Sequence, residues 1–139
     1  MLKILSFRSG ENLYGIETNR ITEIKRNPEI TEIPLAPERI AGVMNLRGQV
    51  VSLLDFAQCL GFSAASPKST CIILKKEKGE ADLFALLVER AEDVIEITEE
   101  LCEAPPPHLR KDYGEKIKKI AKLEKELVMI IDKNKLFRY

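Results

Sequence analysis

The chain has a single histidine, His108, the side chain whose usual pKa best suits a general base near neutral pH. With Cys102 or Ser52 as the nucleophile, it could support a small hydrolase. His108 follows three prolines, which fix φ and remove backbone donors, so we expect an exposed loop and a solvated imidazole there. The sequence has no Gly-x-Ser-x-Gly motif and no phosphate-binding glycine loop. These residues favour a protein that is not an enzyme, with the hydrolase as a distant alternative.

The cysteines Cys59, Cys71 and Cys102 are far apart and form no Cys-x-x-Cys pair. Only one histidine could join them in a metal site, so buried free thiols are the favoured interpretation. The glutamates of segment 99–103 are typical of a solvated acidic edge, because no second group of metal ligands lies near them in the sequence. We therefore expect no metal and no cofactor.

Acidic and basic residues are balanced, with 22 of each and a formal net charge of zero. A protein that neutralises nucleic-acid phosphates needs a basic excess, so we expect no nucleic-acid partner. No apolar run approaches the ~20 residues of a membrane span, and residues 1–5 lack the apolar region of a signal peptide. A chain of 139 residues, 45% of them hydrophobic, can bury a core of its own. We expect a cytoplasmic globular protein that is not inserted in a membrane.

Short apolar segments separated by turn residues predict a chain rich in β-hairpins. The expected hairpins join 2–7 to 13–16, 40–44 to 49–54, and 70–74 to 83–88, and a further strand is expected at 93–98. Asp55 and Asp132 precede short segments, 56–60 and 133–137, that they can cap as helical turns. The small, polar connector 63–69 marks the expected subdomain boundary. Many short strands at close spacing indicate barrels or a sandwich.

The C-terminal part of the chain carries two different patterns. Apolar residues recur at helical spacing among good helix formers at Ile117, Ile120, Leu123 and Leu127. This pattern alone predicts a helix over 115–126. Residues 127–131 are continuously apolar and partly β-branched, which predicts a strand directly after it.

The segment Asn45-Leu46-Arg47-Gly48 predicts a tight hairpin turn, because asparagine and glycine tolerate a positive φ. The arginine is unusual there, since a smaller polar residue would satisfy the turn equally well. Its planar, permanently charged guanidinium could bind a carboxylate within the protein or acceptors on a partner. The residue types alone leave both possibilities open, beside that of a simple surface arginine.

This turn and much of the remaining sequence resemble the family of CheW-type chemotaxis coupling proteins. The resemblance rests on Tyr14-Gly15-Ile16, Ile21-Thr22-Glu23-Ile24, Ile30-Thr31-Glu32-Ile33-Pro34, and Ile40-Ala41-Gly42-Val43-Met44-Asn45-Leu46-Arg47-Gly48, and it continues in 86–89, 93–94, 127–132 and 135–136. It implies a mainly β fold, with a single domain over 1–139 that consists of two five-stranded SH3-like β-barrels packed side by side with short helices. The approximate barrels are 10–65 and 66–130, with terminal segments that cross between them. It also implies that 116–122 is a strand paired with 127–132, and we adopt this strand in place of the helix.

The resemblance further implies a non-catalytic adaptor that couples chemoreceptors to a CheA-type histidine kinase in bacterial or archaeal chemotaxis. The implied partners are the regulatory domain of that kinase and the cytoplasmic tip of methyl-accepting chemoreceptors. The adaptor would be recruited from the cytoplasm to membrane-bound receptor arrays. The alternative within the family is a paralogue that serves a pilus, gliding or other non-flagellar chemosensory pathway.

The receptor- and kinase-binding positions carried over from the family are Ile21, Glu23, Ile24, Gly42, Leu46, Arg47 and Gly48. A further contact to the kinase is carried over to Ala91 and Val94. A helical receptor tip could be held by isoleucine and valine side chains in a groove between the barrels, with Arg47 at its rim. Strict alternation along a strand separates Ile21 from Ile24, so we expect one of the two to belong to the core.

Overall fold

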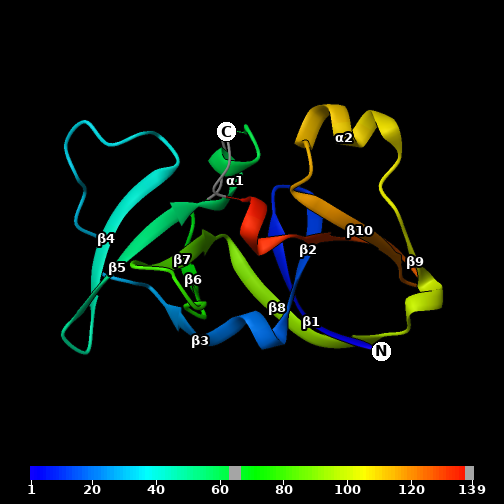
Figure 1. Cartoon of the computed structure of the whole chain (residues 1–139), viewed down its shortest axis with the longest axis horizontal. Coiled ribbons are helices and arrows are strands. Elements are labelled where there is room, and N and C mark those ends of the chain that lie inside the picture. The colour runs from blue at the N-terminus through cyan, green and yellow to red at the C-terminus, as the bar shows by residue number, and fades with distance from the viewer. Residues whose placement is uncertain (63–66, 137–139) are drawn as a thin grey trace.

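The computed structural model describes residues 1–62 and 67–136, and its strands form two β-sheets. The five-stranded sheet has the spatial order β3 (Ile21–Arg26), β6 (Thr70–Leu74), β7 (Leu83–Val88), β5 (Gln49–Asp55) and β4 (Ile40–Leu46). The six-stranded sheet has the order β8 (Arg90–Ile97), β1 (Leu2–Ser9), β2 (Asn12–Glu17), β11 (Leu127–Ile131), β10 (Ile117–Lys122) and β9 (Cys102–Glu103). Figure 1 shows the two sheets side by side. The predicted mainly β fold with two SH3-like subdomains is confirmed, except that one sheet has a sixth strand, the two-residue β9.

The expected boundary between the two barrels lies between residues 65 and 66. The strands on either side of this boundary are not separated into different sheets. Strands β6 and β7 belong with β3, β4 and β5, so the five-stranded sheet is built from one continuous part of the chain, 21–88. Strands β1 and β2 lie in the other sheet with β8 to β11. Residues 63–66 of the connector lie outside the described residues. The chain crosses between the sheets after β2 and after β7, where the sequence carries no strong turn signal.

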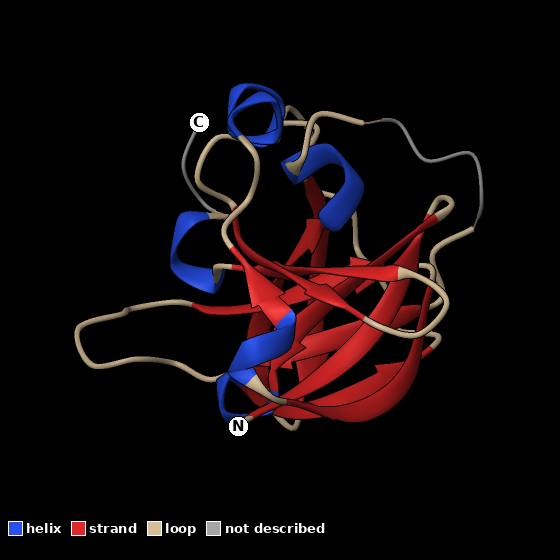
Figure 2. Ribbon diagram, turned by 90° about the vertical axis from the view of Figure 1, so that its right-hand side faces the viewer, coloured by secondary structure: helices blue, strands red, loops and turns tan. Residues whose placement is uncertain are grey.

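Short helical turns lie outside the strands, as Figure 2 shows. The Asp55 side chain accepts a hydrogen bond from the Gln58 amide and caps α1 (Phe56–Cys59), as predicted. Asp132 caps the 3-10 turn η3 (Lys133–Lys135) in the same way, through the Asn134 amide. Further 3-10 turns within the described residues are η1 (Thr18–Arg20) and η2 (Glu99–Leu101). No helix in 1–62 and 67–136 is long and apolar enough to cross a membrane.

The helix α2 (Pro107–Tyr113) lies where a loop was expected around His108. Proline is favoured in the first turn of a helix, because its fixed φ is already helical and its missing amide would have no partner there. The third proline of the run therefore begins the helix instead of preventing it. His108 remains exposed, but on a helix and not in a loop.

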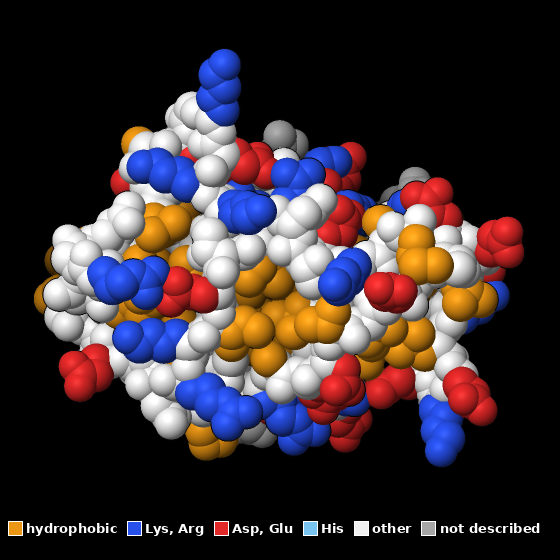
Figure 3. Space-filling model, turned by 90° about the horizontal axis from the view of Figure 1, so that it is seen from below, with side chains coloured by type: hydrophobic (Ala, Val, Ile, Leu, Met, Phe, Trp, Pro, Cys, Tyr) orange, Lys and Arg blue, Asp and Glu red, His pale blue; other side chains and the backbone are white. Residues whose placement is uncertain are grey.

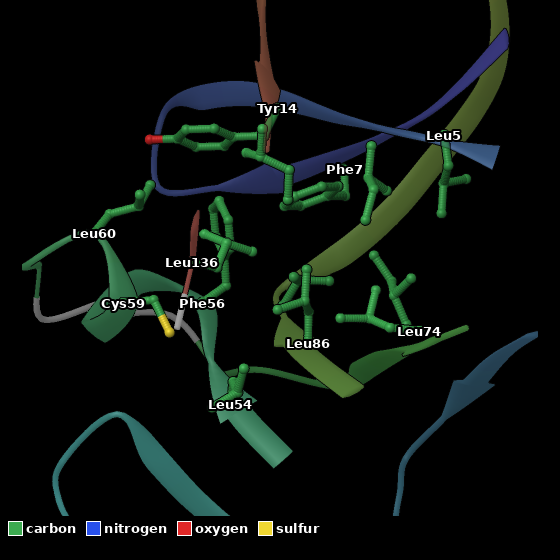
Figure 4. Close-up of a cluster of buried hydrophobic side chains, with 14 of the residues drawn as sticks. Leu5, Phe7, Tyr14, Leu54, Phe56, Cys59, Leu60, Leu74, Leu86 and Leu136 are labelled. Carbon is green, nitrogen blue, oxygen red and sulfur yellow. The ribbon is translucent and has the colours of Figure 1, made fainter. Parts of the chain in front are cut away.

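A shared hydrophobic core joins the two sheets, and Figure 4 shows many of its side chains. Leu5, Phe7 and Tyr14 come from the six-stranded sheet and pack with Leu54 and Leu86 from the five-stranded sheet. Each sheet also has an inner cluster of its own. Strand β6 is buried throughout because its side chains alternate between the shared core and the inner cluster. This explains its continuous run of apolar residues.

Strand β10 replaces the helix that the spacing of apolar residues over 115–126 predicts. The pairing of β10 with β11 is irregular between Ile117 and Lys119, as in a β-bulge. The extra residue brings Ile117 and Ile120, three positions apart, onto the shared core together. A strand with a bulge can therefore show the spacing of buried apolar residues that is typical of a helix.

Candidate functional site

Strand β3 carries three of the residues transferred from the family, and a bulge determines to which face of the sheet their side chains point. Ile21 pairs with Leu74 and Glu23 with Ile73, so Thr22 is the extra residue on β3. Ile24 pairs with Ile72, which faces the shared core as Leu74 does. Cross-strand partners share a face of the sheet, so Ile21 and Ile24 point to the same side. Strict alternation does not separate them, because the bulge changes the phase, but Ile21 packs against the shared core while Ile24 is exposed, so one of the two does belong to the core as expected.

Strand β8 repeats this arrangement at the edge of the six-stranded sheet. Ala91 pairs with Phe7 and Val94 with Leu5, and both partners belong to the shared core. Between these pairs, two residues of β8 stand opposite Ser6, whose buried hydroxyl bonds both the amide and the carbonyl of Asp93 at 3.0 Å. The bulge therefore places Ala91 and Val94, three positions apart, on one face.

These two edge strands form an apolar surface that we call the β3–β8 face, made of Ile21, Ile24, Ala91 and Val94. Ile21 and Ala91 are half-buried and pack against the shared core. Ile24 and Val94 are 44% and 56% exposed. Figure 1 places β3 and β8 along its lower border, and Figure 3, viewed from below, shows hydrophobic side chains gathered in the middle of that surface between charged ones. The face offers apolar area to a partner without unfolding either sheet.

The hairpin turn between β4 and β5 differs in one detail from its prediction. Arg47 and Gly48 are the two residues with positive φ, 49° and 84°, so the arginine and not Asn45 adopts the left-handed conformation. The Asn45 side chain accepts a hydrogen bond from the Gly48 amide at 2.8 Å. Two residues with positive φ between paired strands are typical of a type I′ turn. The turn fixes the backbone from which the Arg47 side chain extends.

Arg47 binds Glu23 in a two-pronged ion pair. Of the possibilities that the sequence left open, the guanidinium therefore does bind a carboxylate within the protein. The Nη2–Oε2 and Nη1–Oε1 distances are 2.6 and 3.2 Å. The hydrogen bond from Arg47 lowers the pKa of the Glu23 carboxyl below its ordinary value. Both side chains remain accessible, that of Arg47 being 71% exposed and that of Glu23 35%. The arginine therefore has a partner within the chain and can still meet a second molecule.

Gly42 and Leu46 have evident structural roles. Gly42 is buried, has φ +151°, and lies so close to the preceding loop that a Cβ would be 2.4 Å from the Thr31 carbonyl oxygen. This close approach lets Thr31 and Val43 exchange two backbone hydrogen bonds, of 2.8 and 2.9 Å. Leu46 is buried in the inner cluster of the five-stranded sheet. These two buried residues therefore stabilise β4 by packing and are not themselves part of an exposed contact surface.

A cavity of about 330 Å³ lies where β3 and β4, the free edges of the five-stranded sheet, approach each other. Its lining consists of Lys25, Asn27, Glu29, Thr31, Met44 and Asn45. Sequence reasoning missed this cavity, because it arises from the closing of the sheet and has no local signal.

The residues of the hydrolase alternative lie on different elements: Ser52 on β5, Cys102 on β9 and His108 on α2. Within the described chain, no hydrogen bond joins the imidazole to either nucleophile. Cys59 and Cys71 are buried as predicted, whereas Cys102 is partly accessible. Burial raises the pKa of the Cys59 thiol to about 11. Over 1–62 and 67–136, no cluster of three His, Cys, Asp or Glu residues is placed to hold a metal ion.

The fold and the β3–β8 face define a class of β-rich proteins with two SH3-like sheets around one core. A family model described as the CheW-like domain matches residues 3–139. The solved structure of the scaffolding protein TtCheW from Thermoanaerobacter tengcongensis has a TM-score of 0.86 and 31% sequence identity, over 99% of this chain and 93% of that one. The chain belongs to the CheW-like family.

Curated relatives agree with this assignment. The chemotaxis protein CheW of Bacillus subtilis (strain 168) is 29% identical over 134 residues, 95% of this chain and 84% of that protein. The chemotaxis protein CheW of Thermotoga maritima is 28% identical over 134 residues, 96% of this chain and 86% of that protein.

Proposed function

We propose that the chain is a non-catalytic adaptor that couples chemoreceptors to a CheA-type histidine kinase in chemotaxis signalling. The observation that carries the proposal is the β3–β8 face, where two bulged edge strands hold an apolar surface between the sheets. A protein that works by presenting surfaces needs such accessible apolar area, which soluble proteins otherwise tend to bury. Membership of the CheW-like family supports the same function.

The β3–β8 face suits the cytoplasmic tip of a methyl-accepting chemoreceptor, which we take to be a helical hairpin. Amphipathic helices bind by laying apolar side chains in a hydrophobic groove. Ala91 and Val94 were carried over from the family as kinase contacts, but they share this face with Ile21 and Ile24, so we assign them here to the receptor contact. Ile24 and Val94 would contribute buried area, while the half-buried Ile21 and Ala91 form the floor. Binding of this kind recruits the protein from the cytoplasm to receptor arrays.

The kinase regulatory domain would contact the same molecule, and Arg47 is a suitable residue for orienting it. The Glu23–Arg47 pair is exposed, so it can rearrange or add a hydrogen bond to a partner's acceptor at little cost to the fold. Polar contacts at an interface contribute orientation and specificity more than affinity.

The test is a binding titration of the receptor hairpin with matched lysine substitutions at Val94 and Leu127. These residues are 56% and 54% exposed, on β8 and β11 respectively. Val94→Lys places a charge in the proposed contact and should weaken binding by about tenfold or more, whereas Leu127→Lys should change it by less than about twofold. Equal affinity of the two variants would exclude the β3–β8 face as the receptor site.

A further inference from the structure

Lys133 is a charged residue almost completely buried between the two sheets. It lies in η3, directly after β11, and its side chain is only 3% exposed. Its ammonium donates to the Lys75 carbonyl oxygen at 2.7 Å and to Glu80 Oε1 at 3.1 Å, and Glu77 Oε1 lies 3.8 Å away. Lysine is rarely buried unless it is paired, because losing its hydration costs several kcal/mol. All three acceptors belong to the loop between β6 and β7, on the other sheet.

The same loop is also tied to the chain that enters β3. The Lys75 amide donates to the Arg20 carbonyl at 2.8 Å, and the Arg20 guanidinium pairs with Glu77. The Glu77 amide donates to Glu80 Oε1 at 2.7 Å, so the two carboxylates are held in one arrangement. We call this group, Arg20, Lys75, Glu77, Glu80 and Lys133, the latch.

The latch joins the start of β3 and the β6–β7 loop to the sheet that carries β8, although none of its residues lies on β8 itself. Arg20 ends η1 and is followed directly by Ile21, the first residue of β3. Lys133 follows β11, which pairs in parallel with β2 in the sheet that also carries β8. A polar cavity beside Lys133 has a volume of only about 20 Å³, enough for about one water molecule.

Stability alone does not require a buried ammonium here. Apolar residues of similar volume often replace buried ion pairs without loss of stability, and the shared core already joins the sheets. Apolar packing is non-directional, however, whereas an ammonium with several acceptors fixes distance and orientation. The arrangement favours a role in setting geometry.

We propose that Lys133 is a positioning residue whose latch sets the spacing between β3 and β8 and thereby the affinity of the β3–β8 face for a helical partner. This inference rests on the proposed function. Lys133 does not touch the partner in this account, and it acts through Arg20 and the start of β3. Loosening the latch lets the two edge strands separate or slide, so that fewer molecules present the face in its binding arrangement.

The test compares Lys133→Met with Lys122→Met in the full chain. Methionine keeps the length of the side chain and removes the ammonium. Lys122 pairs with Glu103 on the exposed surface and serves as the control. One readout is the affinity for a receptor hairpin. The other is the distance between spin labels at Lys25→Cys on β3 and Glu96→Cys on β8, in a Cys102→Ser background that leaves the buried thiols in place.

Lys133→Met should lower the hairpin affinity by roughly three- to tenfold and shift the label distance by about 1–2 Å or broaden it, while Lys122→Met changes neither. Adding Glu80→Gln to Lys133→Met should recover part of both effects, because it removes a carboxylate that has lost its partner. Unchanged distance and affinity in Lys133→Met would overturn the proposal. If the wild type binds no hairpin, the proposed function fails, and the label distance still decides the latch.

If Lys133→Met does not fold, the double variant Glu77→Gln/Glu80→Gln provides the same test. It keeps Lys133 with its bond to the Lys75 carbonyl and weakens the charged part of the latch. A label distance and an affinity equal to those of the wild type would then overturn the proposal. A shifted distance with weaker binding would support it.

Discussion

Arg47 and Glu23 form a two-pronged ion pair, with distances of 2.6 and 3.2 Å, although they belong to opposite edges of the five-stranded sheet. Glu23 lies on β3 and Arg47 in the turn that follows β4. A contact between the first and last strands of a sheet requires the sheet to curl, as it does in a barrel. The ion pair therefore marks one end of the barrel closure, and the hydrogen bonds between Thr31 and Val43 mark another part of it.

Arg47→Glu should weaken the coupling of receptor to kinase while leaving the urea midpoint nearly unchanged. The pair is exposed, and exposed ion pairs contribute little to stability. The variant instead places two carboxylates side by side and reverses the charge shown to a partner. A binding titration with the kinase regulatory domain measures the effect, and the swap Glu23→Arg/Arg47→Glu is the control that restores an internal pair. Full coupling by Arg47→Glu would count against a role for this residue.

Gly42→Ala should destabilise the protein by about 2 kcal/mol or more. The new methyl group would lie 2.4 Å from the Thr31 carbonyl oxygen and 2.8 Å from Ile30 Cγ2, at a φ of +151° that suits glycine. Gly79→Ala is the control, because Gly79 also has a positive φ but nothing lies within 4 Å of its Cβ position. Urea unfolding and hydrogen exchange of the Val43 amide measure the difference. Equal losses in both variants would mean that the close approach to Thr31 has no cost.

Leu35→Gly should leave the free energy of unfolding unchanged or raise it by up to about 1 kcal/mol. Leu35 is fully exposed and has a φ of +65°, after Pro34 in a turn closed by a bond from the Ala36 amide to the Ile33 carbonyl. Such a turn favours glycine at this position. Leu35→Val should lower stability, because β-branched residues tolerate a positive φ poorly. Urea titration of both variants decides, and a marked loss in Leu35→Gly would contradict this description of the turn.

Arg8→Gln should be less stable than the wild type at pH 7, and this difference in stability should disappear at acidic pH. Arg8 on β1 bonds Glu126 at 2.8 and 3.0 Å and Glu92 at 3.1 Å, and these bonds lower the pKa of both carboxyls. A carboxyl whose folded pKa lies below its unfolded value near 4.5 stabilises the fold above that pH, and this contribution is lost as the pH falls through the folded pKa. The difference in urea midpoint between the wild type and Arg8→Gln should therefore shrink below about pH 4.5. A constant difference from pH 7 to 3 would exclude ionisation as its cause.

Local features of the fold were predictable from the sequence, because their causes lie within a few residues. The cap at Asp55, the turn at Asn45–Gly48 and the hairpin of β6 with β7 all depend on side chains and backbone preferences close together in the sequence. The assignment of strands to sheets was not predictable in this way. It depends on pairings such as that of β5 with β7, which brings 51–55 beside 83–87.

The candidate site shows where sequence periodicity misleads. Ile21 with Ile24, Ala91 with Val94, and Ile117 with Ile120 are each three residues apart, which is a helical spacing and breaks strand alternation. In each case a bulge or register shift lies between the two residues. A bulge depends on the pairing partner, so one strand's sequence does not reveal it. The contact between Glu23 and Arg47 and the burial of Lys133 depend likewise on how distant strands close.

Coupling of a receptor to a kinase by this one protein can be measured by sedimentation of a mixture of its two proposed partners. The receptor hairpin and the kinase regulatory domain would be centrifuged together, with and without this protein. We predict that the three components sediment as one complex and that the two partners do not associate at the same concentrations without the protein. Displacement of the hairpin by the kinase domain, or sedimentation of all three as separate species, would contradict the account.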